Sequence, residues 1–398
     1  QKIISLPKMN QQQQRLAKTH ARSRRYSNQH RRYFSIQQHQ PLPLPPWLLG
    51  PDGRRPRRLS PGVVGLHEEL LLFNQWVAPT PAEAAIRCRV VDRLRALVLR
   101  LWPDARLEVF GSSRTGLYLP TSDIDLVLFG RWEALPLRAL ERALREEGCA
   151  TDVLDRATVP IVKLRDSLTG LSVDVSFNMP NGVRAAELIA SFQARFPCLA
   201  PLVMLLKLFL LQRDLNQVWT GGISSYALTL LAVSFLQLHD RRRELTLAPA
   251  HQLNLGTLLL EFLELYGRNF NYLTTAIRLS HGGAYVPKEE VQLDGAIHSA
   301  RPSVLCIEDP LTPGNDIGRS SYGALQVKQA FEFAYLQLHR AVLSSTSQPG
   351  MFHSPLSSIV SAGPDLLRYR EWAAGPADAF RPVRREVHGP AVSTAAFL

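Results

Sequence analysis

The chain has 398 residues, 45% hydrophobic and 20% charged, so it is long enough for two domains with buried cores. Its longest apolar run, Leu202 to Leu211, contains Lys207 and is too short to cross a bilayer, and no N-terminal stretch has the pattern of a signal peptide. We therefore expect no membrane partner. The four cysteines are far apart and form no C-x-x-C pair, which argues against a zinc site or disulfide framework and favours a reducing compartment.

The net charge of +12 is concentrated at one end of the chain. Residues 1–60 contain 13 of the 46 basic residues and one acid, Asp52, which leaves 33 bases and 33 acids in the remainder. This segment is rich in Gln, Pro and Arg, so we expect a disordered basic tail over 1–60. Its arginine clusters fit a nuclear localisation signal, an RNA-contacting arm or a solvated tail, and the sequence leaves these open.

Two helices are expected next. Leu66, Leu70 and Phe73 recur at helical spacing, so we place N-terminal helices at 61–85. Thr80 and Glu83 form a capping box with Pro81 between them, which predicts the start of an amphipathic helix ending near Trp102.

The stretch from Leu107 to Gly130 reads as strand, turn, loop and strand. Gly111 and Ser112 have the turn chemistry of a phosphate-binding concavity, with free backbone N–H groups and a hydroxyl. The second strand alternates, so Asp123 and Asp125 share its polar face. Two carboxylates so close repel each other unless a cation lies between them, and their oxygens suit Mg²⁺.

A third carboxylate, Asp174, lies on the polar face of the strand at Leu171 to Phe177, which forms a hairpin with the strand at Pro160 to Leu164. An amphipathic helix is expected at Leu135 to Glu147. These elements predict an α/β catalytic lobe over 86–190. Three carboxylates beside a phosphate cradle are the arrangement used in two-metal nucleotidyl transfer.

From Ala185 the pattern becomes helical, and we place a mostly helical second lobe at 191–343. Lys207 interrupts an apolar helix, so its ammonium either meets an anion or reaches solvent. Gly221 and Gly222 precede serines that begin another helix, and such an N-terminus either binds phosphate or has an ordinary serine cap. Residues 344–398 are expected to be a largely disordered tail, with a short helix at Leu366 to Trp372.

The segment G-S…T-G…P-T-S-D-I-D followed by V-D-V-S-F resembles the DNA polymerase β nucleotidyltransferase superfamily. Longer phrases resemble one branch, the eukaryotic non-canonical poly(A) RNA polymerases of the TRAMP type: TGLYLPTSDIDLVLFG, FLLQRDLN, TGGISSYAL, ELYGRNFNY and LCIEDPLTPGNDIGRSSYGA. The resemblance covers most of the chain, from Gly62 to Trp372.

The resemblance implies a polymerase-β-like catalytic lobe with a helical poly(A)-polymerase-associated central domain, and a set of site residues. Asp123, Asp125 and Asp174 would be catalytic and hold Mg²⁺ or Mn²⁺. The other implied residues would bind the nucleotide: Gly111 and Ser112 at the phosphates, Gly182 at the ribose, Lys207 and Ser225 at the triphosphate, Tyr226 stacked on the base, and Asn315 and Arg319 near the adenine. The nearby Pro180 and Asn181 depart from the family pattern.

The predicted function is template-independent addition of AMP from ATP to RNA 3′ ends, in RNA surveillance or in mRNA tail regulation. Selection of ATP is expected to be partial, with some GMP misincorporation, because few hydrogen bonds at a base edge decide it. Resemblance implies a zinc-knuckle RNA-binding protein and an RNA helicase as partners, and a location in the nucleus or nucleolus with the cytoplasm as a second site. The alternatives are a terminal uridylyltransferase and a non-catalytic scaffold on the same fold.

Overall fold

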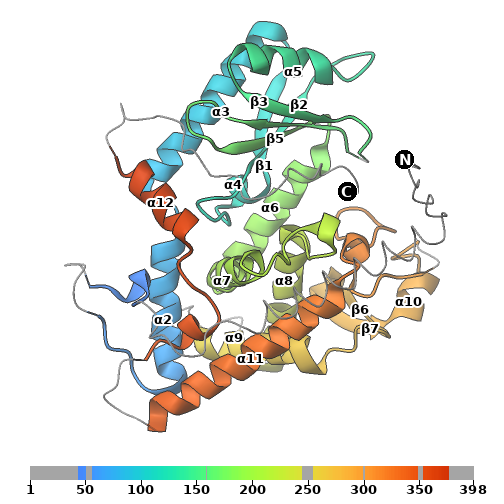
Figure 1. The fold of residues 1–398 in the computed structure, drawn as a ribbon. Coiled ribbons are helices and arrows are strands. Elements are labelled where there is room, and N and C mark those ends of the chain that lie inside the picture. The colour runs from blue at the N-terminus through green and yellow to red at the C-terminus, as the bar shows by residue number, and fades with distance from the viewer. Residues whose placement is uncertain are drawn as a thin grey trace, which may run out of the picture. The chain divides into compact units, whose positions relative to one another are not determined.

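The computed structural model describes residues 44–50, 56–157, 159–243, 254–298, 301–347 and 353–375. All of them belong to one unit, Leu44–Leu398. A five-stranded sheet with its helices, the sheet lobe (residues 81–177), is followed by helix α6 (Pro180–Arg195), which leads into the helical lobe (residues 62–77 and 199–347) (Figure 1). The expected combination of an α/β lobe with a mostly helical lobe is confirmed.

The sheet of the sheet lobe has the strand order β1-β2-β5-β4-β3. Its strands are β1 (Arg106–Phe110), β2 (Ile124–Phe129), β3 (Ala150–Leu154), β4 (Ile161–Arg165) and β5 (Ser172–Phe177). β2 and β5 are parallel, and the other neighbours are antiparallel. The predicted hairpin is formed by β4 and β5. The edge strand β3 was not predicted from the sequence, because only one of its five residues is buried and its apolar residues show little alternation.

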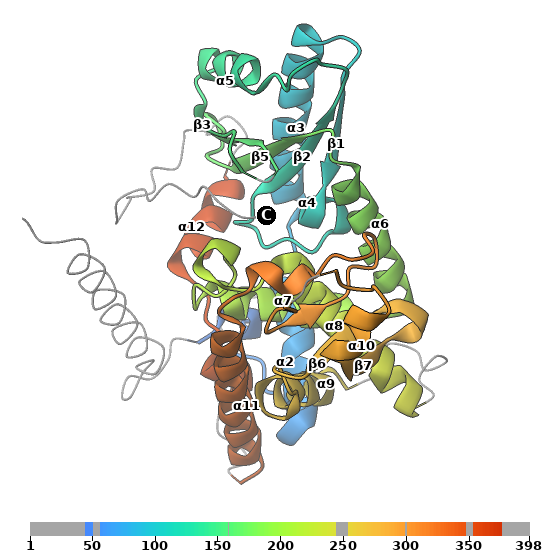
Figure 2. The same cartoon turned by 90° about the vertical axis from the view of Figure 1, so that its right-hand side faces the viewer.

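Helices cover one face of this sheet. α3 (Pro81–Leu101) and α5 (Leu137–Glu146) pack on the apolar residues of β2, Ile124, Leu126 and Leu128, as Figure 2 shows from a second side. The predicted capping box begins α3: Thr80 Oγ1 accepts from the Glu83 N–H at 3.2 Å, and Glu83 Oε2 accepts from the Thr80 N–H at 2.6 Å. The expected turn at Gly111 is the short helix α4 (Gly111–Thr115). The polar face of β2 therefore stays open for the site.

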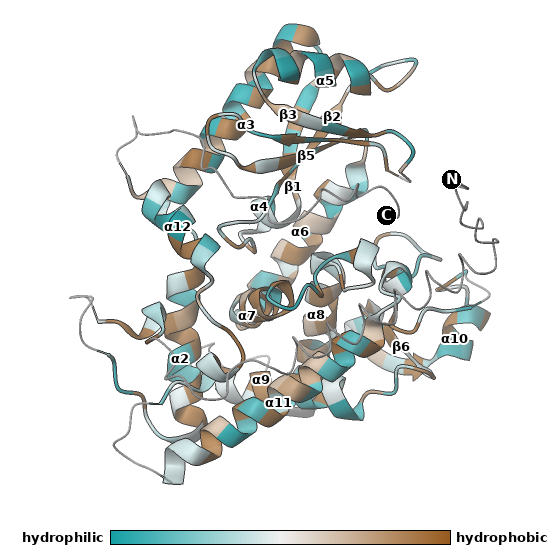
Figure 3. Ribbon diagram, viewed as in Figure 1, coloured by the Kyte–Doolittle hydropathy of each residue, from teal (hydrophilic) through white to brown (hydrophobic). Residues whose placement is uncertain are grey.

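The helical lobe is built around α7 (Leu199–Leu211), which is apolar along most of its length (Figure 3). Around it lie α2 (Gly62–Val77), α8 (Ser225–Arg243), α9 (Leu255–Glu264) and α11 (Ala324–Ser347). A small sheet of order β7-β6-β8 completes the lobe with β6 (Thr275–Arg278), β7 (Ala284–Pro287), β8 (Cys306–Ile307) and the helix α10 (Lys288–Leu293). Within the described residues, no helix has the length and apolar character needed to span a membrane.

The structure differs from the expectation for both tails. Of the expected tail at 1–60, residues 1–43 and 51–55 lie outside the described residues, but Trp47 and Leu48 in the short helix η1 (Pro46–Leu48) are buried in the helical-lobe core. Of the expected tail at 344–398, residues 344–347 complete α11 and residues 353–375 form an ordered segment, which we call the C-terminal strap. The short helix expected at Leu366 to Trp372 is present in this strap. The burial of the segments at both ends was not predicted, because their apolar residues are few and become buried only against distant helices.

The C-terminal strap contacts both lobes. Its first turn, η8 (Pro355–Ser358), places Leu356 in the helical-lobe core, and its helix α12 (Pro364–Ala373) places Tyr369 and Ala373 in the sheet-lobe core beside α3 (Figure 1). Arg370 of α12 donates to the Ala78 carbonyl at 2.9 Å and to Glu83 Oε1 at 3.2 Å, between α2 and α3. The strap therefore fixes the connection between the lobes.

Glu69 of α2 binds two segments that are far apart in the sequence, η1 and the start of the C-terminal strap. Its fully buried carboxylate accepts hydrogen bonds from Trp47 Nε1 at 2.9 Å, from the Leu356 N–H at 2.9 Å and from Ser354 Oγ. Burial raises the pKa of Glu69, against the hydrogen bonds, which lower it. Both oxygens are acceptors here, so a side chain with an amide donor does not fit the same partners.

We expect Glu69→Gln to lower the free energy of unfolding by about 1–3 kcal/mol, because its NH₂ group would face a donor and leave a buried group unpaired. Urea unfolding measures this change. Glu332→Gln, on the half-exposed face of α11, is the control and should be nearly neutral. Equal unfolding free energies for Glu69→Gln and wild type would contradict this account.

Candidate active site

A cleft with a volume of about 620 Å³ is lined by both lobes. Gly111, Ser112, Asp125 and Asp174 come from the sheet lobe, while Lys207, Ser225, Tyr226, Asp309 and Asn315 come from the helical lobe, and Gly182 comes from α6. A second compartment of about 270 Å³ adjoins it and shares Ser112, Asp125, Lys207 and Ser225. The cleft and this compartment therefore meet beside Asp125.

The three predicted carboxylates come from two neighbouring strands. The parallel pairing of β2 and β5 sets Asp125 opposite Asp174, and Asp123 lies at the entry to β2. Burial and the carboxylates of Asp174 and Asp123 raise the pKa of Asp125 to about 7. Desolvation at the cleft wall and Asp174 also raise the pKa of Asp123, although its side chain reaches solvent. In both shifts the neighbouring carboxylates add to the effect of burial, while Lys163, Lys207 and Arg87 oppose it.

Gly111 lies directly against one of these carboxylates. Its φ is +61°, and an added Cβ would lie 2.4 Å from Asp125 Oδ2. Glycine is therefore required here both for the backbone conformation and for the close approach. Ser112 follows it in α4 and lines the cleft and the second compartment.

The acidic group fits a divalent cation, which the family resemblance implies. Within the described residues no three carboxylate, imidazole or thiol side chains are already gathered around one point, and Lys163 Nζ donates to Asp174 Oδ2 at 2.7 Å. Asp125 and Asp174 nevertheless lie opposite each other on neighbouring strands, and oxygen-only donors are those that Mg²⁺ and Mn²⁺ prefer. Asp123, Asp125 and Asp174 are the residues that would hold such ions.

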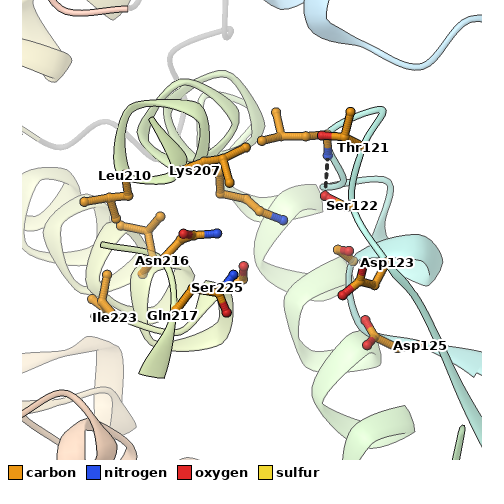
Figure 4. A pocket seen from close by; sticks show the side chains of 14 residues that line it. Thr121, Ser122, Asp123, Asp125, Lys207, Leu210, Asn216, Gln217, Ile223 and Ser225 are labelled. Carbon is orange, nitrogen blue, oxygen red and sulfur yellow. Dashed lines mark hydrogen bonds between the residues drawn. The ribbon is translucent and has the colours of Figure 1, made fainter. Parts of the chain in front are cut away.

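Lys207 and the start of α8 form the opposite wall. The Lys207 ammonium is buried and donates to the Leu117 carbonyl, and burial lowers the pKa of Lys207 to about 8. Figure 4 shows this ammonium pointing across the second compartment toward the segment with Ser122 and Asp123. At α8, the Ser224 hydroxyl accepts from the Ala227 N–H at 3.0 Å, so Ser224 makes the cap and Ser225 is left exposed in the cleft.

Tyr226, Asp309 and Asn315 line the end of the cleft away from Lys163. Burial and Asp309 raise the pKa of Tyr226, whose buried hydroxyl has no partner among the described residues. Asn315 Nδ2 donates to Asp309 Oδ2 at 2.8 Å, and Asp309 Oδ1 accepts from the Leu311 N–H at 2.9 Å. Because a carboxylate accepts this bond, it occupies one N–H of the Asn315 amide, and the second N–H and the carbonyl oxygen remain as a donor and an acceptor.

Of the two remaining predicted residues, Gly182 lies at the cleft and Arg319 does not. Gly182 lines the cleft, where an added Cβ would lie 2.6 Å from the Phe110 ring, so it permits α6 to pack against β1. Arg319, in the short helix η7 (Ile317–Ser320), has an exposed side chain and lines neither the cleft nor the second compartment. The structure does not bring Arg319 to the other predicted residues.

Several residues of the site were not predicted from the sequence. Lys163 lies opposite Asp174 on the neighbouring strand and faces the same side of the sheet, so the alternation of side chains along β4 could have indicated it. Asp309 lies in a turn-rich loop without periodicity, and Asn216 and Gln217 of the second compartment lie in another loop. For these loop residues only the fold brings the side chains together.

Comparisons with known proteins agree with this geometry. Residues 66–194 match the model for the mitochondrial-like poly(A) RNA polymerase central palm domain, and residues 254–315 match the model for the Cid1 family poly A polymerases. The solved polymerase core of TRAMP, an RNA surveillance complex, has a TM-score of 0.67 and 35% identity, covering 75% of this chain and 94% of that chain. The Cid1 poly(U) polymerase, with 22% identity and a TM-score of 0.61, shares the fold.

Relatives with matching sequences carry the same family name. A Drosophila melanogaster protein named inactive non-canonical poly(A) RNA polymerase protein Trf4-2 is 41% identical over 338 residues, which cover 83% of this chain and 81% of that protein. The poly(A) RNA polymerase cid14 of Schizosaccharomyces pombe is 40% identical over 320 residues, covering 77% of this chain but 46% of that protein. Poly(A) RNA polymerase gld-4 of Caenorhabditis elegans is 39% identical, and the matched part covers 40% of its length. This chain belongs to the family of the non-canonical poly(A) RNA polymerases.

Proposed function

We propose that the protein adds AMP from ATP to RNA 3′ ends without a template. The observation that carries this proposal is the cleft in which the Asp125–Asp174 pair faces Lys207, Ser225 and Tyr226 from the other lobe. One wall supplies anionic oxygens for metal ions, and the other supplies a cation, a helix N-terminus and an aromatic ring. A nucleoside triphosphate complements both walls: its phosphates suit the metal ions, the cation and the helix N-terminus, and its base suits the aromatic ring.

In this proposal the residues of the helical lobe hold ATP. Lys207 and the first N–H groups of α8 at Ser225 bind the triphosphate by charge and by unpaired donors. Tyr226 provides a face for the base, and Ser112 with Gly111 binds a phosphate oxygen from the sheet lobe. The second compartment, with Asn216 and Gln217, gives room for the outer phosphates beside Lys207.

The reaction joins the RNA 3′ oxygen to the α-phosphorus of ATP and breaks the bond to the β-phosphate, so pyrophosphate leaves. Divalent ions, when bound by Asp123, Asp125 and Asp174, would favour the deprotonated 3′ oxygen and offset the charge of the triphosphate. Lys163 Nζ lies 2.7 Å from Asp174 Oδ2, so Asp174 would exchange this ion pair for a metal ion. The protein's part is mainly positioning and electrostatics.

The Asn315 amide favours bases that carry an amino group. The bond to Asp309 occupies one N–H of the Asn315 amide and orients it, and the carbonyl oxygen can then accept from the N6 amino group of adenine. Uracil and guanine place a carbonyl oxygen at the corresponding edge and would repel it. One such contact is worth about 1–3 kcal/mol. An amide oriented by Asp309 should therefore allow less GMP misincorporation than an amide that could rotate to present its NH₂ group.

The name of the Drosophila relative favours a second candidate, a non-catalytic RNA-processing protein. A member of this family that lacks activity shows that membership alone does not establish catalysis. Asp123, Asp125, Asp174 and Lys207 are all present in this chain, and each lines the cleft or the adjoining second compartment. These residues favour an enzyme. A terminal uridylyltransferase, the third possibility, shares the fold but would need a different edge contact at Asn315.

We propose that the protein acts on RNA in a TRAMP-like assembly. The structural likeness to the TRAMP polymerase core supports this. The described residues contain no separate RNA-binding module, so a zinc-knuckle protein and an RNA helicase would supply substrate binding. The basic segment 1–60 would add RNA affinity or direct the protein to the nucleus.

Asp174→Asn should lower AMP incorporation into a short RNA primer by about 10³-fold, because it removes one metal-holding oxygen charge. Asp152→Asn is the matched control: Asp152 is opposite Lys163 on the outer strand β3 and should retain activity. Near-wild-type incorporation by folded Asp174→Asn would contradict the mechanism. A folded wild type that incorporates no nucleotide would favour the non-catalytic candidate.

The kcat/KM for ATP should fall as the pH rises above about 8. Lys207 has a pKa of about 8 and is charged only below it, so its attraction for the triphosphate is lost on the alkaline side. Lys207→Arg keeps its charge at every pH, so the ratio of wild-type to variant kcat/KM should decline between pH 7 and 9. Parallel profiles over this range would show that the charge of Lys207 does not bind ATP.

Asn315→Ala should lower the ATP-to-UTP ratio of kcat/KM by about tenfold, as one lost edge contact implies, and should change the turnover of saturating ATP much less. Asn216→Ala removes an amide from the second compartment and should leave the ratio unchanged. The assay compares all four nucleotides on one primer. Faster UMP than AMP addition by wild type would establish the uridylyltransferase instead.

A further inference from the structure

A buried guanidinium lies behind the acidic residues and has no role in the steps above. Arg87 is on α3, is 5% exposed, and packs its guanidinium over the Tyr118 ring with its centre 4.4 Å from the ring centroid. Among the described residues no carboxylate lies within ion-pair distance of it. A buried cation without an anionic partner is costly, so its other contacts must compensate.

Those contacts go to the segment that precedes β2. Arg87 Nη2 donates to the carbonyl oxygens of Ser122 at 2.7 Å and Asp123 at 2.9 Å, and Nη1 reaches the Pro120 carbonyl at 3.4 Å. Nη2 also lies 3.4 Å from Ser113 Oγ in α4. One side chain therefore ties α4 and the residues before β2 to helix α3.

Asp123 depends on this tie because the sheet does not hold it. The ladder between β1 and β2 ends with Phe110 opposite Asp125, and the ladder between β2 and β5 begins at Ile124. The backbone of Asp125 is thus fixed by two strands, whereas Asp123 lies just outside both ladders. Its carbonyl is held by Arg87 instead.

We propose that Arg87 is a positioning residue, which sets the backbone of Asp123 so that its carboxylate meets those of Asp125 and Asp174 at one cation. This inference rests on the proposed function for the role of the cation. The planar fork of arginine serves three carbonyls at once, which the single ammonium of lysine cannot do in the same geometry. The positive charge of Arg87, which has no carboxylate partner of its own, also reduces the repulsion among the carboxylates.

The C-terminal strap forms part of the wall around Arg87. Tyr369 of α12 is buried in the same core as Ile86 and Val90, which lie on either side of Arg87 along α3. This part of the wall therefore comes from a helix more than 240 residues after Asp123 in the chain.

The test compares Arg87→Lys with Arg93→Lys in the full chain. Arg93 is on the same helix and pairs with buried Asp166, away from the cleft, so the two variants make the same chemical change. We expect Arg87→Lys to lower kcat by about 10²-fold with the KM for ATP nearly unchanged, as a displaced catalytic group implies. Direct titration with Mn²⁺, followed by electron paramagnetic resonance, should show weaker binding for Arg87→Lys and unchanged binding for Arg93→Lys.

Thermal unfolding separates positioning from stability. If both variants lose similar stability but only Arg87→Lys loses kcat and Mn²⁺ affinity, the positioning role is established. Unchanged kcat and Mn²⁺ affinity in folded Arg87→Lys would overturn it. If Arg87→Lys does not fold, Arg87→Gln, which retains donors for the carbonyls, is measured in the same way and decides by the same criteria. Because Mn²⁺ binding needs no turnover, this arm remains decisive even if the wild type proves inactive.

Discussion

The site depends on a repulsion that the fold creates and only partly relieves. Parallel pairing of β2 with β5 places Asp125 opposite Asp174, with Asp123 just before the strand, and burial together with these two carboxylates raises the pKa of Asp125 to about 7. One cation from each of three elements opposes this charge: Lys163 from β4, Lys207 from α7 and Arg87 from α3. Lys163 is bound to Asp174 itself, whereas Lys207 and Arg87 are bound to backbone carbonyls. The remaining negative charge is what a divalent ion would neutralise.

The division into two lobes gives each side of the cleft a separate task. The sheet lobe holds acidic groups on a strand pair, and the helical lobe holds the Lys207 ammonium and the N-terminus of α8 across the cleft from them. The chain passes between the lobes at residues 77–81, through α6, and again through the C-terminal strap. Arg370 joins the first and third of these passages through Ala78 and Glu83. Substitutions in the strap are thus able to alter the cleft without touching it.

In the proposed function, recognition of the base depends on the contacts that orient one amide. Asn315 by itself can donate or accept, so its presence does not distinguish adenine from uracil. Asp309 accepts from one N–H of this amide and so orients its carbonyl oxygen, which in the proposal accepts from an amino group of the base.

The sequence by itself determined the features that depend on local patterns. Alternation along β2 and β5 placed Asp123, Asp125 and Asp174 on polar strand faces, and the capping box at Thr80 located the start of α3, because strand and helix periods are set by the backbone. The identity of the family also followed from the sequence, since its longest motifs are contiguous.

Tertiary structure alone decided what depends on contacts between distant segments. It paired Asn315 with Asp309, left Arg319 outside the cleft, and turned Arg87 from a residue within an amphipathic helix toward the backbone of Asp123. It also buried the strap, of which the sequence predicted only the short helix at Leu366 to Trp372. These outcomes could not be predicted because hydrogen-bond partners and burial depend on which surfaces the fold brings together, and a single chain's local pattern does not encode that.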